Sequence, residues 1–239
     1  AAKMIEAADH PIILAGEIIA FEDAYAELQS LALATGAGVI TAYRQQDVFP
    51  NDHEAYFGQL TLNRLPYQRE AWNACDLVIN IGCRLDSATS ADYTLIRDDQ
   101  KMIMAYPDAS VFSQWQADVA MGANAKPAMT ALTEALTNFT PPASRLAWRD
   151  TIHAQEVAFA EPGEISVQGD VDLARVISTF QRVVPSDSIL SCDAGTFGRW
   201  LHRYYRCNAP ISSFGPVSGA MGYGVPGAIG AACADPTRR

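Results

Sequence analysis

The sequence contains no run of 18 consecutive apolar residues, the length that a helix needs to cross a bilayer. It also lacks a surplus of basic residues, because 17 lysines and arginines stand against 27 aspartates and glutamates, a net charge of -10. A face that binds nucleic-acid phosphates requires concentrated lysine and arginine. The sequence therefore predicts neither a membrane nor a nucleic acid among the partners.

Cysteine and histidine are also scarce. The four histidines, at positions 10, 53, 153 and 202, have no metal-ligand spacing to one another or to a cysteine, which argues against a structural zinc site. The cysteines are odd in number, widely spaced and never in a C-x-x-C pair. This usage predicts buried thiols in a reduced, cytoplasmic protein. They are Cys75, Cys83, Cys192, Cys207 and Cys233.

Basic residues are scattered, and the densest cluster lies on a predicted helix. It comprises Arg199, His202, Arg203 and Arg206, which we interpret as a solvated helix face. The N-terminal AAKMIEAADH has neither an initiator methionine nor a targeting signal. Because it opens inside a helical pattern, we expect further residues upstream.

What is present is an alternation of apolar runs with amphipathic helices over residues 1–140. Uninterrupted apolar strands separated by helices predict an α/β fold, a doubly wound parallel sheet that is Rossmann-like and covered on both faces. The predicted strands are 11–16, 38–42, 76–82, 101–107 and 117–123. The predicted helices are 21–36, which stops at Gly36, then 65–74 and 125–139.

The stretch TPPAS at 140–144 marks a boundary, because two prolines and small polar residues interrupt the pattern. Residues 141–168 are predicted to be a linker that contains a helix at 144–160. A second α/β alternation begins at 169, with helices at 171–184 and 196–205, a strand at 188–192 and a helix start at 225–234. Residues 169–239 hold too few strands to close a sheet, which predicts a truncated second α/β domain.

The most unusual stretch is GAMGYGVPGAIGA at 219–231, in which five of thirteen residues are glycine. Within it, residues 222–227 match G-x-G-x-x-G, but no long strand precedes them and no acidic residue follows at the required distance. A dehydrogenase that uses this fingerprint is therefore the weakest alternative. Two interpretations stay open: a glycine-packed helix entry with Met221 in the core, or a backbone platform that approaches a flat ligand.

Two further stretches place polar groups where strands end. In SILSCDAGTFGRW, at 188–200, a strand leads into Asp193 and Gly195, and this turn either binds an anion or is an ordinary connection capped by Asp193 or Thr196. In DLVINIGCRLDSATSADYTL, at 76–95, Arg84 follows a strand. It either meets a phosphate or pairs with Asp86 on the surface.

Together these stretches resemble the thiamine-diphosphate-dependent decarboxylase and acetolactate-synthase-like superfamily. The resemblance rests on PIILAG, on Phe49-Pro50-Asn-Asp-His53 followed by FGQL, on ACDLVINIGCRL, on CDAGTFGRW and above all on GAMGYGVPGAIGA. It covers essentially the whole chain. It implies a middle domain at residues 1–140 and the N-terminal part of a diphosphate-binding domain at 169–239.

The resemblance also implies roles for individual residues. The Gly219 carbonyl and the Met221 N–H would bond the aminopyrimidine ring of thiamine diphosphate, and the Met221 side chain would hold the cofactor bent. Gly195, Thr196 and Phe197 would lie near the diphosphate. Acetolactate synthases usually carry Gln and His where this sequence has Thr196 and Phe197, which puts acetolactate synthesis itself in doubt and leaves the substrate open.

Other parts that the resemblance implies are expected outside this sequence. The Gly-Asp-Gly…Asn motif that holds Mg²⁺ and the diphosphate would begin after Arg239, and the activating glutamate belongs to a pyrimidine-binding domain. We therefore expect no metal ligand and no catalytic residue here, and a fragment that is inactive alone. The parent is expected to be a transferase or lyase, a homodimer or homotetramer that acts on a 2-oxo acid or a related small molecule.

Some members of the superfamily bind FAD or ADP in the middle domain. Arg84 stands at the matching edge, but Glu17 follows Gly16 where FAD binders often carry more glycine, and RLDSATS replaces a run rich in arginine and aspartate. A carboxylate beside a diphosphate is unfavourable, so the sequence disfavours FAD. The alternative function is a regulatory or redox module that binds FAD, ADP or NAD without carboligase activity.

Overall fold

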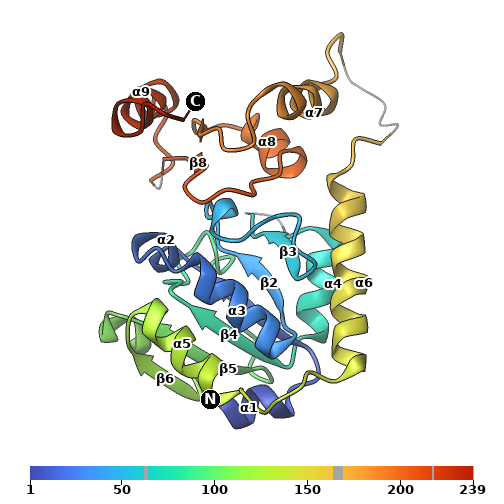
Figure 1. The fold of residues 1–239 in the computed structure, drawn as a ribbon, viewed down its shortest axis with the longest axis vertical. Coiled ribbons are helices and arrows are strands. Elements are labelled where there is room, and N and C mark those ends of the chain that lie inside the picture. Colours follow the sequence, from blue (N-terminus) through green and yellow to red (C-terminus); the bar gives the residue numbers. More distant parts are fainter. Residues whose placement is uncertain (62–63, 164–168, 217, 239) are drawn as a thin grey trace.

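The computed structural model describes residues 1–61, 64–163, 169–216 and 218–238 (Figure 1). A six-stranded sheet with the order β3-β2-β1-β4-β5-β6 forms the centre of the first part, and every pair of neighbours is parallel. This is the doubly wound order, and it confirms the predicted fold class. The strands are β1 (Pro11–Ala15), β2 (Gly38–Thr41), β3 (Tyr56–Gln59), β4 (Leu77–Ile81), β5 (Lys101–Tyr106) and β6 (Val119–Gly122).

Alternate residues of the central strands pack against helices on opposite faces of the sheet. Ile13 and Ile79 are paired in register and share one core with α3 (Tyr25–Thr35) and α5 (Ala125–Ala135). Ile12 and Val78 belong to a second core with α4 (Pro66–Ala74) and α6 (Ala143–Ala160). Because both faces are covered, β1 and β4 are buried along their whole length, which explains their uninterrupted apolar sequences.

The helix predicted at 21–36 is wrong in its extent. The structure has two helices, α2 (Ile18–Phe21) and α3, and Asp23 between them adopts a positive φ of 50° that a continuous helix does not allow. Gly36 ends α3 in the left-handed conformation, as predicted. Strand β3 was not predicted; its four residues follow a polar loop and include Gly58 at φ 87°.

A buried arginine fixes α6 against the N-terminal part of the chain. The Arg145 guanidinium donates to the carbonyl of Thr35 at 2.6 Å, to that of Ile5 at 3.0 Å and to that of Ala8. These carbonyls lie at the ends of α3 and α1 (Ala2–Ala7), where helical carbonyls lack partners and carry partial negative charge. The charge of Arg145 is therefore balanced by hydrogen bonds to helix ends, with the nearby carboxylates of Asp76 and Asp9 adding to the attraction.

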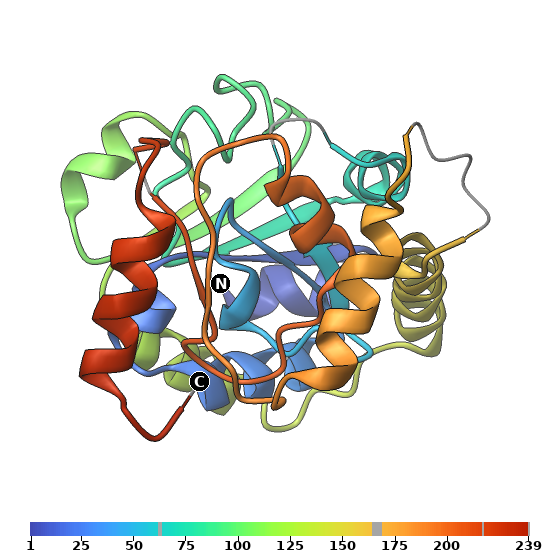
Figure 2. The ribbon, with the colours of Figure 1, turned by 90° about the horizontal axis from the view of Figure 1, so that it is seen from above.

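The second part of the chain is smaller and more open. It contains α7 (Leu173–Val183), β7 (Leu190–Ser191), α8 (Gly198–Tyr204), β8 (Ser213–Phe214) and α9 (Gly224–Ala234), and β7 pairs with β8 in parallel. The structure shortens the predicted strand at 188–192 to two residues. Figure 2 shows α9 on one side of these strands and α7 and α8 on the other.

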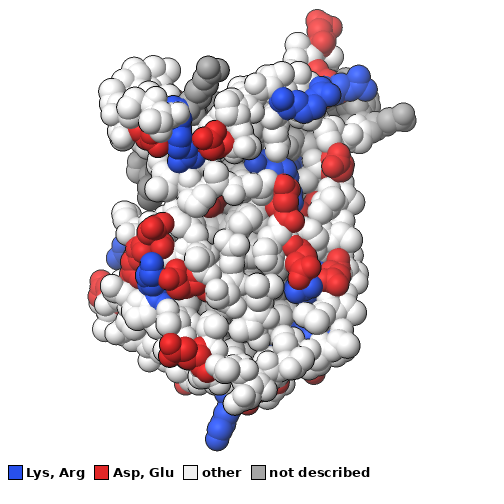
Figure 3. Space-filling view, in the orientation of Figure 1, with Lys and Arg blue, Asp and Glu red and all other residues white. Residues whose placement is uncertain are grey.

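The surface of α9 has no charge. None of its residues is buried, and Val225 and Ile229 are among the exposed apolar side chains. In the space-filling view the outer surface of α9 is uncharged, whereas acidic and basic side chains are mixed over the rest of that face (Figure 3). Among the described residues no helix is long and apolar enough to span a membrane.

Candidate functional site

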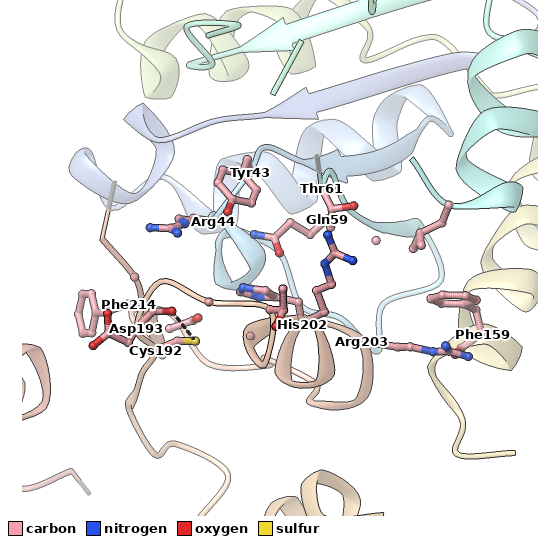
Figure 4. Close-up of a pocket in the computed structure, with 18 of the residues that line it drawn as sticks. Tyr43, Arg44, Gln59, Thr61, Phe159, Cys192, Asp193, His202, Arg203 and Phe214 are labelled. Atoms are coloured by element: carbon pink, nitrogen blue, oxygen red, sulfur yellow. Dashed lines mark hydrogen bonds between the residues drawn. The ribbon is translucent and has the colours of Figure 1, made fainter. Parts of the chain in front are cut away.

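A cavity of about 500 Å³ lies between the two parts of the chain (Figure 4). The first part contributes residues that follow β2 or end β3, together with side chains from α4 and α6. The second part contributes the residues after β7 and one side of α8. The carboxyl ends of parallel strands from both parts therefore meet at this cavity, which is where α/β proteins bind ligands.

Four basic side chains line the cavity: Arg44, Arg199, His202 and Arg203. His202 is half-buried, and its Nδ1 lies 3.1 Å from the Gln46 side-chain oxygen. Burial, together with the charge of Arg44, lowers the pKa of His202 to about 4, so the imidazole is neutral at pH 7. At the right of Figure 4, Arg203 lies over the Phe159 ring at 3.8 Å and donates to the Phe159 carbonyl at 2.8 Å.

The interpretation of the α8 basic cluster as a solvated face is therefore wrong for most of its members. Only Arg199 is exposed. Arg206, just beyond α8, forms an ion pair with Glu156 of α6 at 2.6 Å and a second one with Asp52 at 3.2 Å. Glu156 is buried, and burial raises its pKa. The cluster joins the two parts of the chain, which helical periodicity alone does not indicate.

Backbone and carboxylate hydrogen bonds complete the junction. The N–H of Asn51 donates to the carbonyl of Cys207 at 3.0 Å, and the N–H of Cys207 donates back to the Asn51 side chain at 2.8 Å. The Asp47 carboxylate accepts from the N–H groups of Ser212 and Ser213, at 2.8 and 3.1 Å. These bonds hold the segment before β8 against the loop between β2 and β3.

Asp193 connects the turn after β7 with the glycine-rich segment. Its carboxylate accepts from the N–H of Ala194 at 2.7 Å, from that of Gly222 at 2.9 Å and from that of Gly224 at 3.3 Å. Burial would raise the pKa of Asp193, but these N–H groups outweigh it and the net pKa is lowered. Asp193 is thus a cap, as one interpretation predicted, although it caps α9 rather than the helix that follows it.

The glycine-rich segment forms an exposed turn before α9. Met221 is 86% exposed, so the interpretation that placed it in the core is wrong. Gly219 and Gly222 have φ values of 72° and 90°, and a Cβ added to either would meet nothing within 4 Å. Open space of this kind next to bare backbone fits a flat ring laid against the turn.

The predicted site residues divide into three places. Gly195 and Thr196 line the cavity, and the ring of Phe197, itself 54% exposed, covers Gly195 where a Cβ would collide with it. Gly219 and Met221 lie on the separate turn, which Asp193 links to the first group. Arg44 and Gln59 also line the cavity and were not predicted, because each becomes part of the site only where the two parts of the chain meet.

Arg84 lies elsewhere: it is exposed and follows the carboxyl end of β4, an inner strand of the large sheet. The alternative that pairs it with Asp86 is wrong, since the Asp86 carboxylate instead accepts from the Thr89 N–H at 2.8 Å. Beside it, Glu17 accepts from the Tyr106 hydroxyl at 3.0 Å, and burial raises the pKa of Glu17. No group of three potential metal ligands occurs within the described ranges.

Two family models match the chain. The model for "Thiamine pyrophosphate enzyme, central domain" matches residues 1–132, and that for "Thiamine pyrophosphate enzyme, C-terminal TPP binding domain" matches residues 193–239. The first match covers more than half of the sequence and includes the whole six-stranded sheet.

Individual proteins are similar over the full length of the chain. Sulfoacetaldehyde acetyltransferase from Alcaligenes xylosoxydans xylosoxydans is 27% identical over 100% of this chain and 44% of its own length. The acetolactate synthase large subunit of Corynebacterium glutamicum is 28% identical over 100% of this chain and 38% of its own. The chain thus spans less than half the length of these relatives.

A solved structure shows the same fold. It is the X-ray structure of a protein from Mycobacterium smegmatis, proposed to be a thiamin diphosphate-dependent enzyme. The two superpose with a TM-score of 0.73 at 21% identity, over 98% of this chain and 44% of the other. At this identity the similarity establishes the fold alone.

Proposed function

The chain belongs to the thiamine pyrophosphate enzymes, and from that membership we propose that it serves in an enzyme that cleaves or forms a carbon–carbon bond next to a carbonyl. Bound thiamine diphosphate supplies the group that stabilises a carbanion, and the protein orients it and excludes water. The substrate class we propose is a 2-oxo acid or a related small carbonyl compound. The named relatives act in this chemical range, as an acetolactate synthase and a sulfoacetaldehyde acetyltransferase.

One observation carries the proposal: the exposed Met221 turn with open space beside Gly219 and Gly222. Such a turn would receive the aminopyrimidine ring, with the Gly219 carbonyl and the Met221 N–H as its hydrogen-bonding groups. The Met221 side chain, 86% exposed and free of packing contacts from a core, would support the ring from below. Gly195 and Thr196 would lie toward the diphosphate, which Mg²⁺ would accompany.

The two residues after Gly195, Thr196 and Phe197, bear on the choice of substrate. Thr196 and Phe197 stand where acetolactate synthases usually carry Gln and His, and the Phe197 ring covers Gly195. We accordingly propose a carboligase or decarboxylase of this family that differs from acetolactate synthase in its substrate.

Glu17 supports the proposal that the large sheet does not bind FAD. Its half-buried side chain lies just after β1 and accepts a hydrogen bond from the Tyr106 hydroxyl, close to where Arg84 would meet a diphosphate. A negative or buried acidic group there disfavours a phosphate. The absorbance spectrum of the purified intact protein tests this: a flavin band contradicts it.

Isothermal titration of the intact protein with thiamine diphosphate and Mg²⁺ tests the proposed function. We expect binding at micromolar or lower concentration, and its absence would contradict the proposal. The M221A variant should still bind but turn over pyruvate or another 2-oxo acid more slowly, while V225A, on the exposed face of α9, serves as the matched control. The inactivity of these 239 residues alone stays a prediction, and micromolar binding by them would overturn it.

We also propose a cytoplasmic homodimer or homotetramer for the intact enzyme. The five cysteines are free in the structure, and Cys233 is the one with an exposed side chain. Free thiols agree with a reducing compartment. Light scattering coupled to size-exclusion chromatography measures the assembly directly, and a monomer at working concentration would contradict this part.

A further inference from the structure

The carboxylate of Asp193 forms hydrogen bonds to both loops of the site. It follows β7 directly, and its oxygens accept from the N–H of Gly222 and the N–H of Gly224, which are 29 and 31 residues away in the sequence. It also accepts from its neighbour Ala194, at the start of the loop that holds Gly195. One side chain thus sets the positions of both loops.

The turn that carries Met221 has few other anchors. Gly219 and Gly222 have no atom within 4 Å of the place where a Cβ would lie, and α9 behind them has no buried residue. Helix α9 packs closely against β7 at Gly227, because a Cβ added to this glycine would lie only 2.6 Å from the Ser191 hydroxyl. The hydrogen bonds to Asp193 therefore determine how far the Met221 turn stands from the Gly195 loop.

We propose that Asp193 is a positioning residue that fixes the spacing between the ring-binding turn and the diphosphate-binding loop. This inference rests on the proposed function, because it takes the two loops as the sites for the two ends of one cofactor. A ligand that reaches both loops gains affinity only if their spacing matches its length. Asp193 itself does not touch the reacting atoms. Its carboxylate is turned to the backbone N–H groups, which also limits its repulsion of a nearby diphosphate.

The first measurement is amide hydrogen exchange on the intact protein without cofactor. In D193A the amides of residues 219–224 should exchange about tenfold faster, because the acceptor of two of them is lost. Exchange in β4 should stay as in the wild type, which shows that the variant is folded. The matched control is D187A, since the exposed Asp187 side chain makes no hydrogen bond or ion pair within the described ranges. Unchanged exchange at 219–224 in D193A would overturn the inference.

The second measurement separates positioning from general support of the fold. We expect D193A to bind thiamine diphosphate with Mg²⁺ about tenfold more weakly, while inorganic pyrophosphate, which engages one loop only, binds as in the wild type. D193N keeps one acceptor oxygen and should lie between wild type and D193A. An equal loss for both ligands in D193A, or a D193N variant equal to the wild type in both measurements, contradicts the inference. If the wild type binds no thiamine diphosphate, the proposed function itself fails, which is a separate result.

Discussion

The two parts of the chain are stabilised in different ways. The six-stranded unit has a core on each side of its sheet, and β1 and β4 are buried along their length. The second part has two strands of two residues, a helix α9 without a buried residue, and apolar side chains exposed on α7. Its position depends on hydrogen bonds and ion pairs to the first part, through Arg206, Asp47 and Asn51.

This difference assigns separate tasks to the two parts. Burial of apolar surface stabilises the first part independently of any ligand. The second part leaves its loops exposed next to the cavity, where their backbone groups are available to bind a ligand. A scaffold with its own core thus supports loops that have little core, and four experiments test how far that separation holds.

The largest effect is expected in the sheet. Ile79 in β4 is fully buried and pairs with Ile13 and Ile103, so I79A should lower the free energy of unfolding by about 3–4 kcal/mol. The control I229A, at a 60% exposed position of α9, should change it by less than about 0.5 kcal/mol. Urea denaturation followed by circular dichroism measures both. Equal effects would show that the two parts do not differ in the way described.

The second-largest effect is expected at the junction between the two parts of the chain. R206A leaves the buried Glu156 without its partner, which should cost about 3 kcal/mol in the stability of the docked second part. The control R175A removes a pair in which the arginine is 81% exposed and should cost about 0.5 kcal/mol or less. Hydrogen exchange of residues 185–213 reports undocking. If R206A leaves that exchange unchanged, the ion pair does not hold the parts together.

Protonation of His202 at acidic pH should destabilise the same junction. Its pKa is about 4 in the folded chain and near 6.5 when unfolded, so the unfolded state binds more protons between these values. The contribution of His202 to the free energy of unfolding is therefore present above pH 6.5 and is lost as the pH falls toward 4. Between pH 7 and pH 5 the loss is about 2 kcal/mol. Denaturation at several pH values measures the slope. H202Q should lack this contribution, and an identical slope in both proteins would exclude His202 as its source.

The smallest effects on stability are expected at two glycines, Gly222 in the turn before α9 and Gly230 within α9. Gly222 has a φ of 90°, so G222A should destabilise the turn by about 1 kcal/mol. Gly230 lies inside α9 with open space around it, so G230A should stabilise the helix by about 0.5–1 kcal/mol. Thermal denaturation measures both, and a shift of the same sign in the two variants would contradict the assignment of the turn.

The sequence predicted best the features that depend on neighbouring residues. The apolar runs at 11–16 and 76–82 became β1 and β4, and Gly36 ended α3. The short strands β3 and β8 were missed, because pairing with a neighbouring strand stabilises them more than their own composition does. The division of the chain into domains at 140 and 169 stays a prediction.

The site was predictable only in part, for a related reason. The glycines of 219–231 indicated an unusual backbone, and the structure shows that backbone at Gly219 and Gly222. Nothing local to Asp193 indicates that it reaches Gly222, and nothing local to His202 indicates that Gln46 and Arg44 would enclose it. Contacts between residues that are distant in the sequence decide these features.

The length of α6 has a consequence for how such a chain can vary. Arg145 and Ile152 fix the helix to the first part, and its last turns carry Glu156, which pairs with Arg206, and Phe159, which supports Arg203. One residue inserted between Ile152 and Glu156 would rotate those last turns by about 100° and advance them by about 1.5 Å. Both contacts would then face away from α8. The helix is a spacer of fixed length, so we expect an insertion or deletion between Arg145 and Phe159 to break the contacts at one of its ends.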